Sequence, residues 1–589
     1  MQALASSIAA LLRLSPYYTP QSQSSRPAPP TPPTLNDDIL LSVLSRSSRQ
    51  TAASMMATCH FLYHEGAKII LRDWPVVFDS IASEHKALSL LRFIQAEHFS
   101  RCSYVRNLRV SMHPMPDAVA KSLVDLLPRM TSLDSLFLTI EHALESHPDL
   151  IPAFASLRSI HNLVINAGER SCELIRSLQS QLVSAQLYFC PDNTEAGQRL
   201  YLNPAFHPLI MLERSSLTLK MLTCGMWFDI DPRFLFSMPS VTYPNMHTFT
   251  FYESRSPGLG PYIKSFPNLA HLTEDIDIDH TSPGLWDSDM SRLAAIQRSI
   301  NLDIPGTSPT GESLAWKQLC EYKGHLVDLW IHGFSCRISR LFLQDEPTAR
   351  PPSALTDVLA DALPTELTIV FRKCSLTDVL GANCLSALST EGAAGLRRLT
   401  LRIELRAKDC DLDVGRALDG IGETISQLDL TSLDIEVRDV GLDQSEETSI
   451  SDEADRESSL QPEAMAAAAA GVHGDAHTQT SGATTTAPNP DGTPHAPTSA
   501  PEWKPLSKGE RTLEAFDVHA FTARFTCSSD TLQDAVVSIQ SPRRCGGIMR
   551  SVRQLRIPAG IRLPVGQVVY ASELVGGEVS DRLWAGIVE

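Results

Sequence analysis

The amino-acid sequence predicts a mixed α/β chain built from repeated strand–helix units. Short apolar-x-apolar segments recur at near-even intervals, a polar turn follows each one, and a helix-like stretch comes next. A length of 589 residues ordinarily suggests several domains, unless the chain forms one elongated repeat array. The even spacing favours the array, and a conventional α/β sheet with similar alternation is the alternative.

The predicted strands share the apolar-x-apolar pattern and lie 23 to 38 residues apart. Their first apolar residues are Leu108, Leu136, Leu163, Leu187, Leu217, Phe249, Leu302, Leu329, Leu367, Leu399 and Leu433, with a weaker match at Leu272. Several of them show a fuller apolar-x-x-apolar-x-apolar pattern. A window matches that pattern by chance with a probability of roughly 8%, so the spacing carries the prediction rather than the individual segments.

One strand and one helix per unit, with a period in the twenties to low thirties, resembles a leucine-rich repeat. The Asn or Cys that usually closes the turn after the strand is missing, since Glu141 stands there after Leu138. The resemblance therefore implies an irregular leucine-rich-repeat solenoid over residues 100–440.

Two stretches have the composition of disordered segments. Residues 1–34 carry seven prolines among Ser, Thr and Gln, and residues 444–505 are acidic and then rich in Ala, Thr, Pro and Gly. The strand pattern resumes at Leu513 and again at Val552, and removing the 62 residues of 444–505 leaves 21 between Leu433 and Phe516. We therefore expect an insertion extruded from a continuing solenoid, with 511–589 as its continuation and C-terminal cap.

Residues 35–74 have the pattern of three short helices. Asn36 or Asp37 is a good N-cap, and acidic residues in a first turn suit the helix dipole. About 40 residues rarely bury enough surface to be stable alone. We expect this unit to pack on a partner, on the first repeat, or on both.

The run from Leu35 to Leu44, the Met-Met-x-x-Cys-His-x-Leu run at 55–62 and the Ile-Ile-Leu run at 69–71 resemble the F-box motif. The resemblance implies docking on the Skp-type adaptor of a cullin-based ubiquitin ligase, while the repeats bind a target protein. The residues that it implies for the adaptor surface are Leu35, Ile39, Leu40, Val43, Leu44, Met55, Met56, Cys59 and Leu62. The alternative is a helical cap on a protein-interaction scaffold that binds no adaptor.

The target surface is expected on the concave face, from the residues between two inward strand positions. Phe137, Tyr188 and Trp330 are the large side chains at such positions, and aromatic anchors dominate many interfaces. On the strand within 397–406, Arg398, Arg402 and Arg406 alternate with apolar residues and could bind acidic or phosphorylated segments. A solvated face, or pairing with the acidic insertion of the chain itself, is the alternative.

No nucleotide-binding, nucleophile-elbow or zinc-protease motif occurs, so we expect neither an enzyme nor a cofactor or metal site. The formal charge of −18 argues against a general nucleic-acid binder, and no apolar run of about 18 residues suggests a membrane span. The 12 scattered cysteines, without any Cys-x-x-Cys, favour reduced thiols and a cytoplasmic or nuclear protein.

Overall fold

A computed structural model describes most of the chain between residues 36 and 557. The ranges described are 36–189, 203–226, 241–252, 260–275, 316–345, 351–371, 384–439, 506–528, 531–543 and 549–557, except 82, 335 and 352, with isolated positions 292, 294–296, 298–299, 376, 379 and 442. The chain divides into two compact units, Met1–Cys224 and Gly225–Glu589. The predicted tail 1–34, the insertion 444–505 and the strand at Leu302 lie outside the described residues.

The first unit begins with the three helices that the sequence predicts. They are α2 (Asp37–Arg46), α3 (Arg49–Met56) and α4 (His60–Asp73). The side chains of Asn36 and Ser48 accept hydrogen bonds from Asp38 N and Thr51 N, which fixes the start of α2 and of α3. The helices bury a small shared core of Leu44, Ala52, Met56, Leu62 and Ala67.

Six strands follow in the first unit, each beside the strand that precedes it in the sequence. They are β1 (Val76–Asp79), β2 (Asn107–Ser111), β3 (Ser135–Leu138), β4 (Asn162–Ala167), β5 (Ser184–Phe189) and β6 (Met221–Gly225). The pairs from β1 to β5 are parallel. Helical segments connect them: α5 (Glu84–Gln95), η1 (Ser100–Tyr104), α6 (Asp117–Leu126), η2 (Leu127–Arg129), α7 (Glu141–Ser146), α8 (Leu150–Ala155), α9 (Glu169–Ser177), η3 (Pro204–Phe206), α11 (Pro208–Met211) and η4 (Glu213–Ser215).

The second unit has the same order of strands. They are β7 (Thr248–Tyr252), β8 (His271–Asp275), β9 (Gln318–His325), β10 (Arg337–Asp345), β11 (Glu366–Phe371), β12 (Arg398–Leu405), β13 (Ser432–Asp439), β14 (Asp534–Arg543) and β15 (Met549–Ile557). Every pair from β7 to β14 is parallel, and β15 returns antiparallel to β14. The helical segments are α13 (Gly260–Ser265), α15 (Leu326–His332), α16 (Ala354–Ala362), α18 (Cys384–Leu388), η6 (Glu391–Ala393), η7 (Ala407–Asp409), α19 (Val414–Ile425), α22 (Lys508–Ala515) and α23 (Val518–Ser528).

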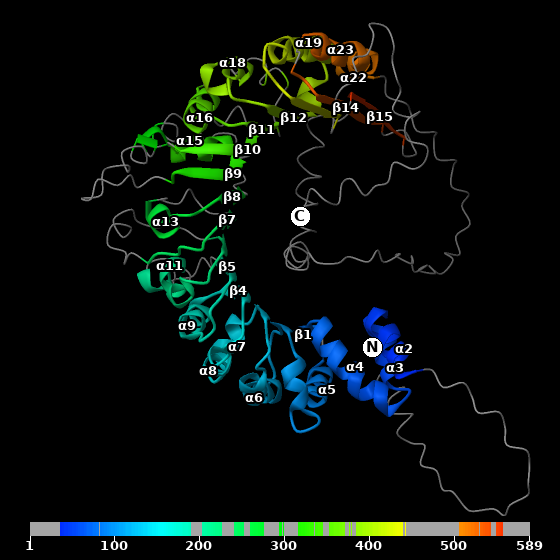
Figure 1. Cartoon of the computed structure of the whole chain (residues 1–589), viewed down its shortest axis with the longest axis vertical. Helices are drawn as coiled ribbons and strands as arrows, with labels where there is room; N and C mark the ends of the chain where they lie inside the picture. Colours follow the sequence, from blue (N-terminus) through cyan, green and yellow to red (C-terminus); the bar gives the residue numbers. More distant parts are fainter. Residues whose placement is uncertain are drawn as a thin grey trace, which may run out of the picture. The chain divides into compact units, whose positions relative to one another are not determined.

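Within each unit the helices that connect the strands lie on one side of them (Figure 1). Strand residues alternate in burial, as in β4, β5 and β12, because successive side chains point to opposite faces of a sheet. The apolar set is buried under the helices, and the polar set is half-buried or exposed on the other side. We call that other side the open face of each unit.

One backbone junction recurs at the start of the strands. A carbonyl just before one strand accepts two hydrogen bonds, from the backbone N–H groups of two consecutive residues at the start of the next strand. Asp134 O, for example, accepts from His161 N (2.8 Å) and Asn162 N (3.0 Å). The carbonyls that do this belong to Arg106, Asp134, His161 and Val183 in the first unit and to His247, Ala270, Thr365, Arg397 and Thr431 in the second. Hydroxyls reinforce it, since Ser159, Thr365 and Thr431 each donate to a carbonyl of the preceding repeat. The repeats are therefore joined alike although their side chains differ.

Three predicted strands are wrong. Leu217 lies in a turn ahead of β6 and is 71% exposed, Leu329 belongs to α15, and Leu513 belongs to α22. The α22 segment begins with a capping box between Ser507 and Glu510, which fixes a helix there. Every residue of α15 is buried, so its apolar residues lack the 3.6-residue period that marks a helix.

The chain on both sides of residues 443–505 forms one sheet and one helix layer. Strand β14 pairs in parallel with β13, with Asp534 opposite Ser432. Helix α22 packs on α19, where Thr512 Oγ1 accepts a hydrogen bond from Val414 N at 3.0 Å. At Gly422 of α19, a Cβ atom would lie 2.7 Å from the ring of Phe521, so glycine allows α23 to pack closely.

We expect a protease cut within residues 444–505 to leave both fragments associated, because β13–β14 pairing and the α19 contacts do not depend on that segment. Size-exclusion chromatography of the nicked chain should give one peak that contains both fragments, and it should separate into two only in denaturant. Two fragments that migrate independently in native buffer would contradict the shared sheet.

Candidate functional site

Helix α2 presents an apolar ridge to solvent. Ile39 is 50% exposed and Val43 is 49% exposed, and the two lie one turn apart on the same face of the helix. We call this pair the α2 ridge. Single exposed apolar residues are ordinary, but neighbouring ones on a small helical unit form a surface that a partner can bury.

The nine residues that the sequence suggests for adaptor binding fall into separate groups. Leu44, Met56 and Leu62 are buried in the core of the three helices, and Leu40 and Met55 pack against that core. Ile39, Val43 and Cys59 are exposed. Leu35 lies outside the described residues. The structure thus divides the set between a core role and a surface role, which helical spacing alone could not do.

The helical unit is fastened to the next elements through Arg101 of η1. This side chain is 1% exposed, and its guanidinium lies over the rings of Tyr63 (4.7 Å) and Phe93 (4.5 Å). Its Nη2 donates to Glu97 at 2.6 Å, and Glu97 also pairs with His64 of α4 at 2.6 Å. The hydrogen bond from Arg101 lowers the pKa of the Glu97 carboxyl. We call Arg101, Glu97 and His64 the Arg101 clamp.

The clamp holds a strained turn. Glu97, His98 and Phe99 have φ values of 57°, 58° and 67°, in the left-handed region that costs an L-residue about 1–2 kcal/mol. The guanidinium of Arg129 lies over the ring of Phe99 at 4.1 Å and adds a second anchor. A left-handed turn without glycine persists only where its surroundings determine it, and the clamp supplies those surroundings.

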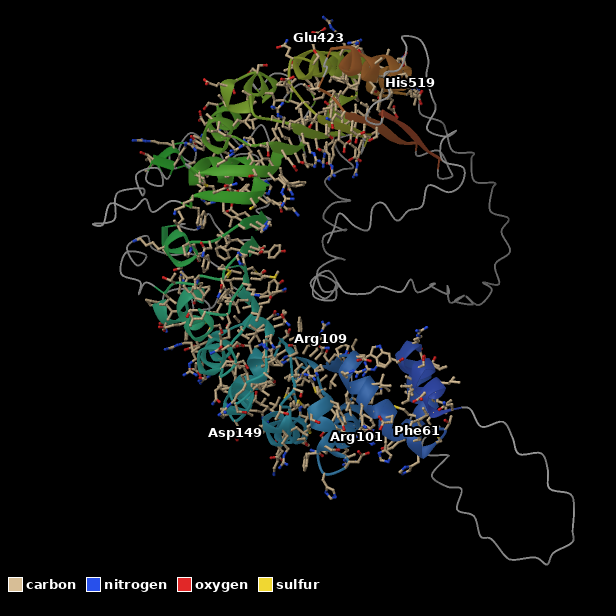
Figure 2. All side chains as sticks on the ribbon, viewed as in Figure 1. Phe61, Arg101, Arg109, Asp149, Glu423 and His519 are labelled. Atoms are coloured by element: carbon tan, nitrogen blue, oxygen red, sulfur yellow. The ribbon has the colours of Figure 1, made fainter. Side chains whose placement is uncertain are left out.

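In the described part of the first unit, a cation–π pair lies on the open face. Arg109 of β2 lies opposite Phe137 of β3, with its guanidinium 4.3 Å from the ring centroid. Tyr188 of β5 donates from its hydroxyl to Gln186 Oε1 at 3.3 Å on the same face. Figure 2 shows Arg109 on the strand side of this unit and Asp149 on its helix side. Phe137 and Tyr188 are therefore on the open face and half-buried.

The three arginines of β12 and its end each pair with a carboxylate of the same sheet. Arg398 contacts Glu366 (3.5 Å), Arg402 contacts Glu436 (3.4 Å), and Arg406 contacts Glu404 (3.5 Å). In each pair the arginine is more exposed than its partner; Arg402 is 25% exposed and Glu436 is 8% exposed. Arg438 adds a second cation to Glu436 at 2.6 Å. The open face of β11–β13 is thus a lattice of opposite charges with arginines outermost.

The position of Asp434 in this lattice changes the pKa of its carboxyl. Burial raises the pKa of its carboxyl, nearby Glu436 raises it further, and Arg402 opposes both effects. This carboxyl therefore takes up a proton at a higher pH than an exposed aspartate does.

Trp330 does not belong to the open face, which corrects its assignment as a target-binding residue. It lies in α15, is 6% exposed, and donates from its indole to Asp357 of α16 at 2.9 Å. Arg298 covers the ring, with its guanidinium carbon 5.2 Å from the ring centroid. Trp330 therefore fixes α15 against α16 within the helix layer.

The described residues provide no group of three or more His, Cys, Asp or Glu side chains that could hold a metal ion. Asp409, in an acidic run, is fully buried and accepts hydrogen bonds from Leu376 N (2.7 Å) and Arg406 N (3.1 Å), so its role is structural. Seven cysteines are free thiols: Cys59, Cys102, Cys172, Cys224, Cys320, Cys336 and Cys410. Burial raises the pKa of both Cys102 and Cys336 to about 11 and makes these thiols unreactive.

No helix in the described part of the chain is both long enough and apolar enough to span a bilayer. No protein-family model matches the sequence, and no curated protein matches it significantly.

We expect Arg101→Met to lower the free energy of unfolding of the first unit by about 2 kcal/mol, because it removes a charge-assisted hydrogen bond and leaves the left-handed turn without its anchor. Denaturant unfolding and limited proteolysis at the left-handed turn after α5 would measure the loss. Arg158→Met is the matched control, since Arg158 is exposed and bonds only to Gln179 among the contacts described. Equal stability of the two variants would contradict the role of the clamp.

Proposed function

We propose that the chain is a substrate-recognition subunit of a cullin-based ubiquitin ligase. Its helical unit would dock on a Skp-type adaptor, and its repeats would bind the target protein. The observation that carries the proposal is the α2 ridge: an exposed apolar pair on a small helical unit with its own core, fastened ahead of a parallel sheet. The chain would act without catalytic chemistry of its own, in the cytoplasm or the nucleus.

The helical unit supports the adaptor part of the proposal because different apolar residues form its core and its exposed surface. Leu44, Met56 and Leu62 fill the core, which leaves Ile39 and Val43 without a structural task. An apolar ridge of this kind fits a helix-in-groove contact, in which side chains one turn apart act as anchors. Asp37 and Asp38 at the start of α2 flank the ridge and would favour a partner with basic residues at its rim.

The repeats support the target-binding part. We propose that the strands and helices of each unit form an irregular leucine-rich-repeat solenoid. Strand order follows chain order without the reversal of a doubly wound sheet, and one backbone junction recurs from repeat to repeat. Solenoids bind partners along the strand side, where Phe137, Tyr188, Arg398, Arg402 and Arg406 are the candidates.

A specific observation favours the alternative, a scaffold whose helical unit only caps the repeats. The Arg101 clamp and the packing of Phe93 against the helical core already give α2–α4 a structural function. Terminal repeats need such a cover. In that case the α2 ridge would stay exposed in the cell.

We expect the double variant Ile39→Asp and Val43→Asp to lose binding to purified Skp-type adaptor, because two charges would be buried in an apolar interface. A pull-down with the full chain measures the loss, and circular dichroism checks that the fold is retained. The ridge is the appropriate target because Leu44 is fully buried, and an aspartate there would unfold the helices.

Ser45→Asp is the matched control, since Ser45 lies on α2, is exposed and points away from the ridge. It should bind the adaptor like the unmodified chain. A folded chain that never binds the adaptor would contradict the ligase proposal and support the scaffold. Adaptor binding that survives the double variant would instead contradict the α2 ridge as the docking surface.

A further inference from the structure

Four titratable side chains are buried together in the second unit, away from the open face. They are Glu274 of β8, Tyr322 of β9, and Asp328 and His332 of α15. The side chains of Glu274 and His332 are 0% exposed, and Asp328 is 4% exposed. Buried ionisable groups are rare unless they are paired, so the cluster needs a physical account.

Glu274 lies at the centre of the cluster. Its Oε1 is 2.7 Å from His332 Nε2, and its Oε2 accepts a hydrogen bond from the Tyr322 hydroxyl at 2.8 Å. Asp328 precedes His332 by one helical turn on α15, so both side chains lie on one face of the helix. Asp328 Oδ2 is buried and has no hydrogen-bond partner.

The cluster is closely packed. A Cβ atom at Gly324 would lie 2.7 Å from the Tyr322 hydroxyl and 3.1 Å from Glu274 Cβ. His332 stacks on Phe334 with 5.4 Å between ring centroids. Water has little room to solvate a charge here, and each ionised group depends on the other three.

The other charged groups on the elements packed around α15 are engaged elsewhere or face outward. On α16, Asp357 accepts from Trp330 and Asp361 pairs with Arg298. Among the side chains of β9 and β10 whose burial is described, the remaining titratable ones are half-buried or exposed: Cys320, Glu321, Lys323, His325, Arg337 and Arg340. Two carboxyl groups therefore face one imidazole, and full ionisation would leave a net charge of −1 inside the unit.

We propose that Glu274, Asp328 and His332 form a proton-linked lock, which holds α15 on β8 and β9 at neutral pH and loosens as pH rises. The ion pair of Glu274 with His332 requires the imidazolium. Asp328 keeps its proton because a second buried carboxylate would be repelled by Glu274.

The pKa directions agree with this geometry. Burial and the charge of Glu274 raise the pKa of Asp328 to about 8, against the smaller opposite effect of His332. Burial disfavours the charged form of His332, but Glu274 outweighs it and raises the pKa of the imidazole above its usual value. Both groups hold protons in the folded state that the unfolded chain releases at lower pH. The contribution of Asp328 to stability is therefore fully present only below its ordinary pKa of 3.8 and is lost as pH rises to about 8, and the contribution of His332 is lost as pH rises above its ordinary pKa of 6.5.

The test is urea unfolding of the full chain between pH 6 and pH 9, with hydrogen exchange of α15 measured at pH 9. We expect the unfolding constant to rise with pH, by up to about tenfold per pH unit for each proton released. Asp328→Asn cannot ionise, so it should flatten the profile, become more stable than the unmodified chain at pH 9, and slow exchange of α15 there. Comparison at one pH removes the intrinsic pH dependence of exchange.

Asp411→Asn is the matched control, because Asp411 is exposed in the same unit. It should keep the profile of the unmodified chain. A flat profile for the unmodified chain would overturn the proposal without any variant, which covers the case in which Asp328→Asn fails to fold. Parallel profiles for Asp328→Asn and the unmodified chain, or equal exchange of α15 in both at pH 9, would overturn it as well.

Discussion

The architecture depends on one backbone contact: a carbonyl at the start of a strand that accepts two N–H groups from the next repeat. Arg106 O, Asp134 O and Thr431 O each do this, although an arginine, an aspartate and a threonine share no side-chain chemistry. Because the contact uses only main-chain atoms, it tolerates divergent sequences as long as each strand can start at the same level as its neighbour. It also leaves the connection from one strand to the next free in length, which allows the long segment between β13 and β14.

The sequence could predict those strands in which buried and outward-facing residues alternate. Leu108 and Val110, or Leu399 and Leu401, are buried beneath helices while their neighbours face outward, and that period of two is visible in one dimension. The pattern failed at α15, where Leu329, Trp330 and Ile331 are all buried and no period separates helix from strand. The same pattern missed β9 and β10. In each of these strands two adjacent residues face outward just before an inward residue, Tyr322 in β9 and Leu341 in β10, and this interrupts the alternation.

The candidate site was predictable in kind but not in detail. Helical spacing identified the apolar face of α2, yet Leu44 and Val43 are adjacent in sequence and opposite in role. The arginines of β12 were visible, but Glu366 and Glu436 lie 32 and 34 residues from Arg398 and Arg402, and only the register brings them together. The left-handed turn at Glu97–Phe99 has no glycine to mark it, and the buried group around Glu274 comes from three separate elements. Both are products of packing, which no local pattern encodes.

The Arg101 clamp has a mechanical consequence. The Arg101 guanidinium lies over two aromatic rings, and its partner Glu97 also pairs with His64 of α4. These contacts prevent the short connection between α4 and β1 from acting as a hinge. The three helices and the first strands therefore move as one body, and whatever the α2 ridge contacts acquires a defined orientation to β1–β3. An insertion or deletion between α4 and β1 would change the orientation of the three helices to β1–β3. An insertion or deletion between later strands would leave that orientation unchanged.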